Sequence, residues 1–370
     1  MSKFGRNVKR ICTRWFIDAF SGMAQGLFCT LIAGTILEQI AKWVGGDNYI
    51  GKILLIFAQI AKTLMGAGIG VGIAHSLKSN KLVIFSAGVA GLVGAFSSKI
   101  IDETFSLTLG VPGNPIGAYV VALLVVEITT LYAGKTKLDI LIIPLGALVL
   151  CLGGIFVAFP FIWLIDQLGK FIAIATGITP FFMGMIISVI MGILLTMPTS
   201  SAAIWISVAT PVISGYPATV SAEHYNAILL AGGAAVVGCS CHMIGFAVAS
   251  FRENGVSGLI SQGIGTSMLQ IPNIMKNPRI MLPEIIASAV LGPVATCLFG
   301  LKCNAAGGGM GTSGLVGVFG TIEASSGLNP VLLTFGIILL LFVLPALISF
   351  GLSELFRKIG WIREGDQKIQ

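Results

Sequence analysis

The run LDILIIPLGALVLCLGGIFVAFPFIWLI, at residues 138–165, decides the class of this protein. Its one charged residue, Asp139, stands at the start, and the apolar remainder exceeds the roughly 20 residues that cross a bilayer as a helix. The whole chain shares this character, because 55% of its 370 residues are hydrophobic and only 10% are charged. Soluble domains carry about 25% charged residues. The sequence therefore predicts a polytopic membrane protein and excludes a soluble enzyme, a secreted disulfide scaffold and a nucleic-acid-binding module.

Apolar runs of this kind recur along the chain and predict about ten transmembrane helices. We place them near residues 17–41, 53–76, 82–98, 117–133, 138–165, 177–197, 200–213, 225–250, 283–303 and 330–352. The segment 200–213 is bounded by prolines and is too short to cross a bilayer as a straight helix. It is predicted to be either half of a broken helix or a re-entrant element.

The positions of Lys and Arg predict the orientation of the chain. With ten crossings and the N-terminus inside, sixteen of these cations lie in inside loops or at the ends, and five lie in outside loops. The positive-inside rule then predicts that both termini are cytoplasmic. Residues 1–16, which are basic and amphipathic, are predicted to form a cytoplasmic surface helix, and residues 354–370 a cytoplasmic tail.

Two segments of the C-terminal half interrupt the helical pattern. Gly307-Gly308-Gly309-Met310-Gly311-Thr312-Ser313-Gly314 is a poor helix interior, and irregular backbone at membrane depth must face protein or water. Thr196-Met197-Pro198-Thr199-Ser200-Ser201 ends one helix and supplies hydroxyls that cap the next. We predict re-entrant elements near 198–213 and 305–327. A surface loop is the alternative for the glycine segment.

The two interruptions predict where a solute binds. Each places hydroxyl side chains at a helix start, where free backbone N–H groups attract polar or anionic groups, and transporters build substrate sites from such broken helices. A carboxylate follows the glycine segment, and a histidine lies deep in a neighbouring span. The predicted substrate-binding residues are Thr199, Ser200, Ser201, His242, Thr312, Ser313 and Glu323. Capping or helix packing alone is the alternative role for these residues.

Ionisable residues at membrane depth are expensive and therefore need a partner or a function. Lys62 lies in the middle of the second predicted span and Glu127 deep in the fourth, so we predict a structural ion pair between them. Lys62 is alternatively able to extend its amine to the interface. Several ionisable residues near span ends are expected to be interfacial, namely Glu38, His75, Asp139, Asp166 and Glu284.

The sequence predicts neither a metal nor a cofactor. Cys239-Ser240-Cys241-His242 has a C-x-C-H spacing, but its potential ligands do not share a helix face and no second ligand pair stands at zinc spacing. Catalytic motifs are also missing, which predicts that the chain is not an enzyme. The glycine-rich stretches 66–72 and 88–94 are predicted to pack helices closely, either within one chain or at a dimer interface.

The string Gly309-Met310-Gly311-Thr312-Ser313-Gly314-Leu315-Val316-Gly317, with the ten-span layout and the two helix breaks, resembles the phosphotransferase-system EIIC-like membrane family. The resemblance is to EIIC type 2, which includes the PfoR-type proteins, and it covers nearly the whole chain. It implies a homodimer. An N-terminal transmembrane bundle at 17–170 would pair the two copies, and a C-terminal bundle at 171–353 would bind the substrate.

The chain departs from the sugar-specific members of that family. Sugar EIIC proteins of the glucose type carry a Gly-Ile-Thr-Glu string whose Glu binds sugar. Here Gly177-Ile178-Thr179 is followed by Pro180, whereas Gly320-Thr321-Ile322-Glu323 keeps the Glu in a changed order. The phosphorylatable Cys of a IIB domain and the His of a IIA domain are not supplied as soluble modules, so phosphate would come from separate proteins.

The resemblance implies a permease that binds and translocates a small polar solute, such as a sugar, by alternating access in the bacterial cytoplasmic (inner) membrane. The alternative is a membrane sensor or regulator of the PfoR type, which uses an EIIC-like fold without transport. The expected partners are the solute, the lipid bilayer, a second copy of the chain and separate IIA and IIB proteins; nucleic acid is not expected.

Overall fold

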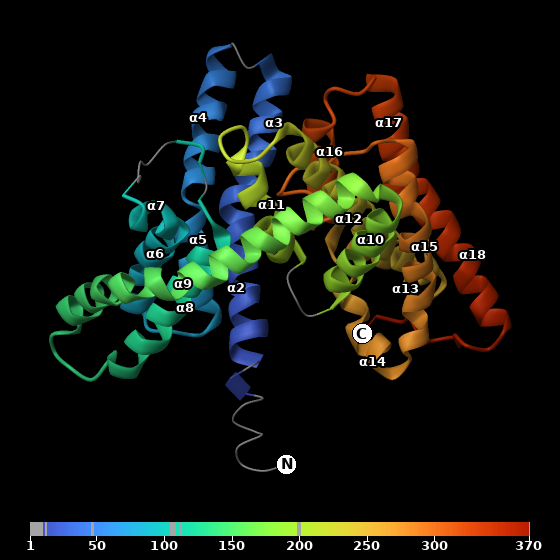
Figure 1. Ribbon diagram of the computed structural model, residues 1–370. Coiled ribbons are helices and arrows are strands. Elements are labelled where there is room, and N and C mark those ends of the chain that lie inside the picture. Colours follow the sequence, from blue (N-terminus) through green and yellow to red (C-terminus); the bar gives the residue numbers. More distant parts are fainter. Residues whose placement is uncertain are drawn as a thin grey trace. The chain divides into compact units, whose positions relative to one another are not determined.

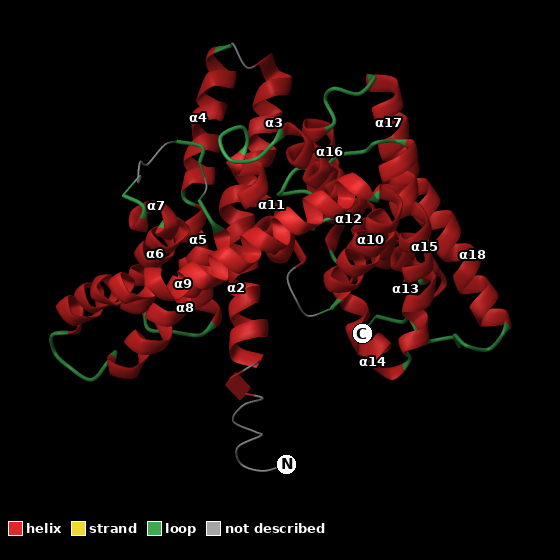
Figure 2. Ribbon diagram, in the orientation of Figure 1, coloured by secondary structure: helices red, strands yellow, loops and turns green. Residues whose placement is uncertain are grey.

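The computed structural model describes residues 10–11, 13–45, 48–103, 109–111, 113–197 and 201–369, apart from the side chain of Gln39. All regular secondary structure in these residues is helical (Figure 2). The chain divides into two compact units, Met1–Gln167 and Leu168–Gln370. The division falls inside the 40-residue helix α9 (Asp139–Ile178), and the predicted boundary between residues 170 and 171 lies in the same helix.

Six helical segments among the described residues are long and apolar enough to cross a membrane. They are Arg14–Gly45, Pro115–Tyr132, Asp139–Ile178, Ala222–Ala249, Pro278–Leu298 and Pro330–Lys358. Two further helices, α4 (Tyr49–Thr63) and α5 (Met65–Ser76), meet at a 53° bend and together make a seventh candidate. The all-α polytopic fold class is therefore confirmed.

Three of the ten predicted crossings correspond to helices that are too short to count as spans by this measure. They are α6 (Lys81–Ala95), α10 (Pro180–Thr196) and α11 (Ser201–Gly215), with 15, 17 and 15 residues. A straight crossing takes about 20 residues, so the structure has six or seven candidate spans where the sequence predicted about ten.

The predicted surface helix at 1–16 differs from what the structure describes. Residues 1–9 and 12 lie outside the described residues, but Arg14 begins a continuous helical stretch to Gly45. This stretch is made of η1 (Arg14–Ala19), α2 (Phe20–Leu27), η2 (Phe28–Ile32) and α3 (Ala33–Gly45). Residues 14–16 are therefore the first turn of an apolar helix and not the end of a separate surface helix.

The alternating glycines of α5 pack this helix against two neighbours within the first unit. Gly68 and Gly72, which share one face of α5, meet Gly26 and Gly22 of α2 so closely that a Cβ on either partner would collide with the other backbone. Small residues four apart allow such close approach of helices where lipid offers no hydrophobic drive.

Gly66 and Gly70, on the other face of α5, lie against α6. A Cβ on Gly70 would collide with the carbonyl oxygen of Ala87, and one on Gly91 with the carbonyl oxygen of Gly66. The same kind of contact continues from α6 to α8 (Pro115–Tyr132), where Gly94 and Gly117 meet. The glycine stretches therefore join α2, α5, α6 and α8 within the unit.

The predicted ion pair between Lys62 and Glu127 is wrong, because each residue has a different partner. Lys62 Nζ lies 2.7 Å from Glu38 Oε2, and Lys42 Nζ lies 3.1 Å from the other oxygen of the same carboxylate. The carboxylate is available because α3 and α4 pack side by side as consecutive helices (Figure 1). Glu38 is therefore the centre of a three-charge cluster, although the sequence indicated only an interfacial acid.

Glu127 is bound by the first helix of the chain. Arg14 Nε donates to Glu127 Oε1 at 2.7 Å, and Trp15 Nε1 donates to the same oxygen at 3.2 Å. Tyr119, two turns earlier on α8, donates its hydroxyl to the carbonyl of Trp15 at 2.6 Å. Arg14 reaches Glu127 because it belongs to the helix that packs on α5 and α8 and not to a separate surface segment.

We expect the Glu38–Lys62 pair to stabilise the first unit measurably. Its side chains are each only 21% exposed, so Glu38→Gln leaves the ammonium group of Lys62 poorly solvated and should cost about 1.5–3 kcal/mol, whereas the Lys42 side chain, 45% exposed, stays in contact with solvent. The double change Glu38→Gln with Lys62→Met should cost less than the sum of the single changes. Unfolding of purified protein in detergent measures this cycle.

The matched control is the pair Arg252–Glu354, whose arginine side chain is 64% exposed. Its coupling should stay below about 1 kcal/mol, as for other surface ion pairs. Additive costs for Glu38→Gln and Lys62→Met would contradict the role given to the partly buried Glu38–Lys62 pair.

Three helices of the second unit meet through small residues. These are α10, α12 (Ala222–Ala249) and α15 (Leu282–Pro293). A Cβ on Gly238 would collide with the carbonyl oxygen of Ser188, and one on Gly292 with the carbonyl oxygen of Gly184. Ser188 also donates its hydroxyl to the carbonyl oxygen of Ser288 at 2.6 Å. Helix α10 therefore packs in direct backbone contact with both α12 and α15.

Shorter elements complete both units. The first contains α7 (Ser97–Ile101). The second contains α13 (Phe251–Ile260), η3 (Ser261–Gly265), η4 (Ser267–Gln270), α14 (Ile271–Lys276), η5 (Pro278–Met281), η6 (Val294–Leu298), η7 (Ser313–Leu315), α16 (Val316–Ala324), α17 (Pro330–Ile338), η8 (Leu339–Val343) and α18 (Leu344–Lys358). Most of the helix breaks of this unit therefore lie between residues 251 and 344.

The last residues of the chain are bound by buried and half-buried amide side chains, in an arrangement that we call the C-terminal clasp. Asn254 and Gln270 both donate to the carbonyl oxygen of Gln367, at 2.8 and 2.9 Å, and Asn273 donates to that of Lys368 at 3.0 Å. Gln367 is fully buried. The predicted tail at 354–370 therefore begins inside α18 and ends as a packed part of the second unit.

Candidate solute-binding site

The break between α10 and α11 contains the first group of predicted site residues. Helix α10 ends at Thr196, and α11 starts at Ser201. Thr199 and Ser200, two of the predicted substrate-binding residues, lie between them and outside the described residues. Ser201 is almost fully buried, with 3% of its surface exposed. The two residues that flank the break, Thr196 and Ser201, are therefore the ones whose contacts define this region.

Ser201 lies against the glycine loop, by which we mean residues 307–314. Its hydroxyl donates to the carbonyl oxygen of Gly309 at 2.7 Å, across 108 residues of sequence. A Cβ on Gly309 would lie 2.5 Å from the carbonyl oxygen of Ser201, and one on Gly308 would collide with the indole of Trp205. The glycines are needed here because their missing side chains leave room for the start of α11.

The far side of the glycine loop rests on α12. Gly311 has a φ of +56°, and a Cβ there would lie 2.8 Å from atoms of Cys239 and Ser240. Both the backbone conformation and the lack of space exclude a side chain at this position. The loop is therefore clamped between α11 and α12, and the sequence interruption corresponds to packed irregular backbone.

The hydroxyls of Thr312 and Ser313 hold the loop to η3. Thr312 Oγ1 donates to the carbonyl oxygen of Gly263 at 2.6 Å, and Ser313 Oγ donates to that of Gly265 at 2.9 Å. Thr312 is fully buried. Both hydroxyl protons are committed to backbone oxygens, so in this conformation the two side chains retain only lone pairs for a solute.

Glu323 braces the other end of the loop. The amide of Asn304 donates to Glu323 Oε2 at 2.5 Å, while Asn304 Oδ1 accepts the backbone N–H of Gly307 at 2.8 Å. The carboxylate, which lies on α16, is partly exposed. Asn304 therefore links the predicted acidic residue to the first glycine of the loop.

His242 faces α10 and not the glycine loop. Its Nδ1 lies 2.9 Å from Thr196 Oγ1, which lies 3.0 Å from Ser267 Oγ. The ring is fully buried against Gly192, and its Nε2 has no hydrogen-bond partner among the described residues. A buried ring nitrogen without a partner costs free energy unless a ligand or water satisfies it.

The predicted residues thus form two groups on either side of one helix break. Thr196, just before the break, contacts His242, and Ser201, just after it, contacts the glycine loop. Glu323 belongs to the loop group through Asn304. The structure brings the two broken segments together and places His242 against the end of α10.

Sequence reasoning missed two polar groups of this region and misplaced Glu284, which lies elsewhere in the same unit. The Nε1 of Trp205 is buried against Gly308 and has no partner among the described residues, and Asn304 connects Glu323 to the loop. Glu284, expected at the interface, is fully buried. For Trp205 and Asn304 the sequence did contain a signal, because each lies within a few residues of a predicted helix break.

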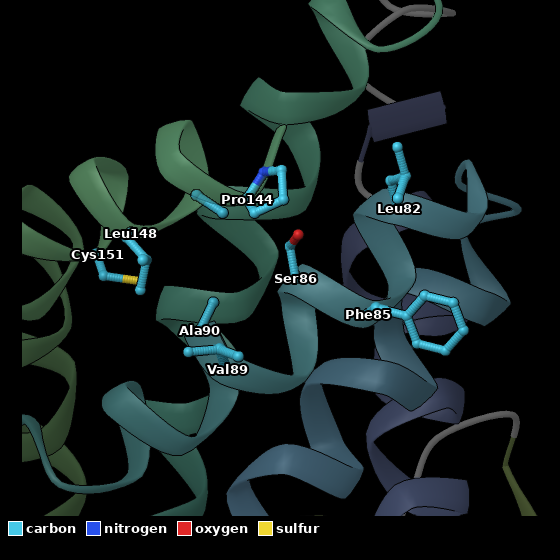
Figure 3. A pocket seen from close by; sticks show the side chains of 9 residues that line it. Leu82, Phe85, Ser86, Val89, Ala90, Pro144, Leu148 and Cys151 are labelled. Atoms are coloured by element: carbon cyan, nitrogen blue, oxygen red, sulfur yellow. The ribbon is translucent and has the colours of Figure 1, made fainter. Parts of the chain in front are cut away.

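A separate cavity of about 270 Å³ in the first unit does not suit a polar solute. It lies between α6 and α9 and is lined by apolar groups such as Phe85, Leu148 and Pro144 (Figure 3). The hydroxyl of Ser86 and the thiol of Cys151 are its most polar side-chain groups. Since polar ligands require convergent polar groups, the region around the helix break is the better candidate.

Among the described residues, no group of three or more His, Cys, Asp and Glu side chains is placed to hold a metal ion. The chemistry available at the break is hydrogen bonding by hydroxyls, amides, a carboxylate and an imidazole. Such groups recognise a neutral or weakly charged polar molecule.

Comparison with known proteins adds the family. No curated protein matches the sequence. A family model described as "Phosphotransferase system, EIIC" matches residues 17–369, which is nearly the whole chain and includes both helix breaks. With its all-helical membrane fold, this chain therefore belongs to the EIIC family of the phosphotransferase system and is a membrane transporter component of that system.

Proposed function

We propose that this protein is a permease that binds a small polar solute, a sugar or a related polyhydroxy compound, and translocates it by alternating access. The observation that carries the proposal is the 2.7 Å contact between Ser201 and Gly309, which joins two helix breaks within one unit. Irregular backbone at membrane depth is tolerated where it faces protein or a water-filled cavity, and transporters bind their substrates at such breaks.

The polar groups around the contact fit a hydroxyl-rich solute. Glu323 is a strong acceptor, and charge-assisted hydrogen bonds are about twice as strong as neutral ones. His242 Nε2 and Trp205 Nε1 are buried and unpartnered among the described residues, which makes them available to a ligand that reaches them. The proposed binding residues are the seven predicted ones, Thr199, Ser200, Ser201, His242, Thr312, Ser313 and Glu323.

The remaining parts of the proposal follow from the family and the charge distribution. The chain would not itself be an enzyme, and phosphorylation of the cargo would use separate IIA and IIB proteins. We place it in the bacterial cytoplasmic membrane as a homodimer with both termini in the cytoplasm. The orientation is supported by the excess of cations in the inside loops of the ten-crossing layout.

We expect Glu323→Gln to weaken solute binding by about 1.5–3 kcal/mol, or roughly ten- to a hundredfold. Glutamine keeps the shape and can still accept the amide of Asn304, so the loop stays braced while the charge is lost. The probe is a panel of monosaccharides, disaccharides, polyols and nucleosides, screened by thermal shift on purified protein, and the hit is then titrated against the variant.

Glu223→Gln is the charge-matched control, because Glu223 is exposed at the first turn of α12. It should bind the hit as the wild type does. Unchanged binding in both Glu323→Gln and Ser201→Ala would place the site elsewhere. Binding without uptake into proteoliposomes that contain IIA and IIB would favour the sensor over the permease.

A further inference from the structure

Glu284 is a fully buried carboxylate whose two oxygens have no hydrogen-bond partner among the described residues. It lies in the first turn of α15, and its main-chain carbonyl accepts the hydroxyl of Ser288 at 2.8 Å. The side chain therefore projects into the interior of the second unit without the donors that a buried carboxylate needs. Because its oxygens accept no hydrogen bond from the described residues, it takes no part in the hydrogen bonds of the proposed solute site.

Two serine hydroxyls of α18 are buried in the same way. Ser349 and Ser353 are fully buried, and neither hydroxyl has a partner among the described residues. They lie one turn apart and so share a face of the helix. Serines within helices usually donate to the carbonyl four residues earlier, as Ser207 does to Ala203 at 2.7 Å. These two oxygens are instead left available.

The side chains of Glu284 and Ser349 approach the same point beside Gly245 of α12. The point at which a Cβ on Gly245 would stand lies 2.6 Å from Ser349 Oγ and 2.8 Å from Glu284 Cγ. Both groups therefore converge on the space that the missing side chain leaves. Helices α12, α15 and α18 pack against one another around it (Figure 1).

Basic side chains of the surrounding helices are engaged elsewhere. Arg357 pairs with Glu253 at 2.9 Å, and Arg279 stacks on the ring of Trp361 at 5.5 Å. Helix α10 contains no ionisable residue. Several ionisable groups lie on the elements packed against α15, beyond the first turn of α12 and the exposed Lys358. They are Cys239, Cys241, His242, Arg279, Cys297, Glu354 and Arg357.

We propose that Glu284, with Ser349 and Ser353, forms a binding site for a monovalent cation, either a proton or Na⁺. An unpaired buried carboxylate is too costly to persist as such, and neutralisation by a bound cation removes that cost. Two carboxylate oxygens and two hydroxyls are hard oxygen ligands. A single negative charge matches a monovalent ion, whereas divalent ions usually take several carboxylates.

This site is independent of the proposed solute site. It uses residues of α15 and α18, and its occupancy can be measured without any solute. The inference therefore stands or falls separately from the permease function. Where transport takes place, a cation held between packed helices is the kind of group through which transporters couple an ion to their cargo.

The experiment uses the purified full-length protein in detergent. Thermal unfolding is followed while NaCl replaces choline chloride at constant ionic strength, and infrared difference spectra between acidic and alkaline buffer are recorded without Na⁺. We expect one of two results. Na⁺ raises the melting temperature in a saturable manner, or the spectra contain a carboxylic-acid C=O band that is missing in Glu284→Gln.

Ser349→Ala keeps the carboxylate and removes one ligand. It should weaken the apparent Na⁺ affinity by about tenfold, or shift the C=O band if a proton occupies the site. The matched control is Ser207→Ala, which removes an equally buried but locally bonded hydroxyl and should leave both responses unchanged.

The outcomes separate the two cations and test the proposal. A saturable Na⁺ response that Glu284→Gln abolishes identifies Na⁺, and an acid band of Glu284 without an Na⁺ response identifies a proton. Absence of both responses in the wild type overturns the proposal. Where Glu284→Gln does not fold, the serine variants decide: responses identical to wild type in Ser349→Ala and Ser353→Ala also overturn it.

Discussion

Gly238→Ala is expected to prevent accumulation of the folded protein. The added methyl group would collide with the carbonyl oxygen of Ser188. Gly238 lies inside α12 and Ser188 inside α10, so the colliding atoms belong to helix backbones that cannot shift locally. Neither helix can rotate away, because α15 holds the same face of α10 through Gly292. Overpacking of a well-packed core typically costs about 1–3 kcal/mol, and a clash between two backbones belongs at or above the upper end.

Gly351→Ala is the matched control within the same unit. It adds the same methyl group to α18, where nothing lies within 4 Å of the new atom. Because alanine favours a helix interior over glycine by about 1 kcal/mol, this variant should be as stable as the wild type or more stable. The yield of monodisperse protein and its melting temperature measure both changes. Equal behaviour of the two variants would refute the tight α10–α12 crossing.

Removal of residues 365–370 is expected to loosen the segment 251–277 and to destabilise the second unit. The truncation takes away the carbonyl oxygens of Gln367 and Lys368, which leaves the amides of Asn254, Gln270 and Asn273 without these acceptors. An unsatisfied buried donor costs about 1–3 kcal/mol, so the loss amounts to several kcal/mol where water does not enter. Hydrogen exchange of residues 251–277 should accelerate.

Lys368→Ala is the control that removes a charge of the tail and keeps the C-terminal clasp. Its side chain is exposed, and the substitution keeps the backbone carbonyl that accepts from Asn273. Hydrogen exchange should therefore match the wild type. A truncated protein with unchanged exchange and melting temperature would mean that the clasp contributes nothing to stability.

The sequence predicted the class and the helix breaks because both depend on local composition. A run such as 138–165 is apolar whatever surrounds it, and a triple glycine or an internal proline disfavours helix in any context. The proximity of the segments that contain Ser201 and Gly309 could be predicted for the same reason, because two irregular segments at membrane depth must face protein or water.

Pairing between helices could not be predicted in this way. Hydropathy predicts a pair between Lys62 and Glu127 because both lie in the middle of apolar runs, but it does not say which faces of two helices meet. The actual partner of Lys62, Glu38, lies on the helix before it, and Glu127 is taken by Arg14. Glu284 was read as interfacial from its place near a span end, and only the packing of α12 and α18 buries it.

The glycine crossings of the second unit have a consequence for how a permease of this kind would move. Helices α10, α12 and α15 touch backbone to backbone, so none can slide or turn without the others, and packed interfaces of this sort change in discrete steps. The three helices should therefore travel as one rigid body. Backbone rotation would be concentrated in the turns that flank the glycine loop.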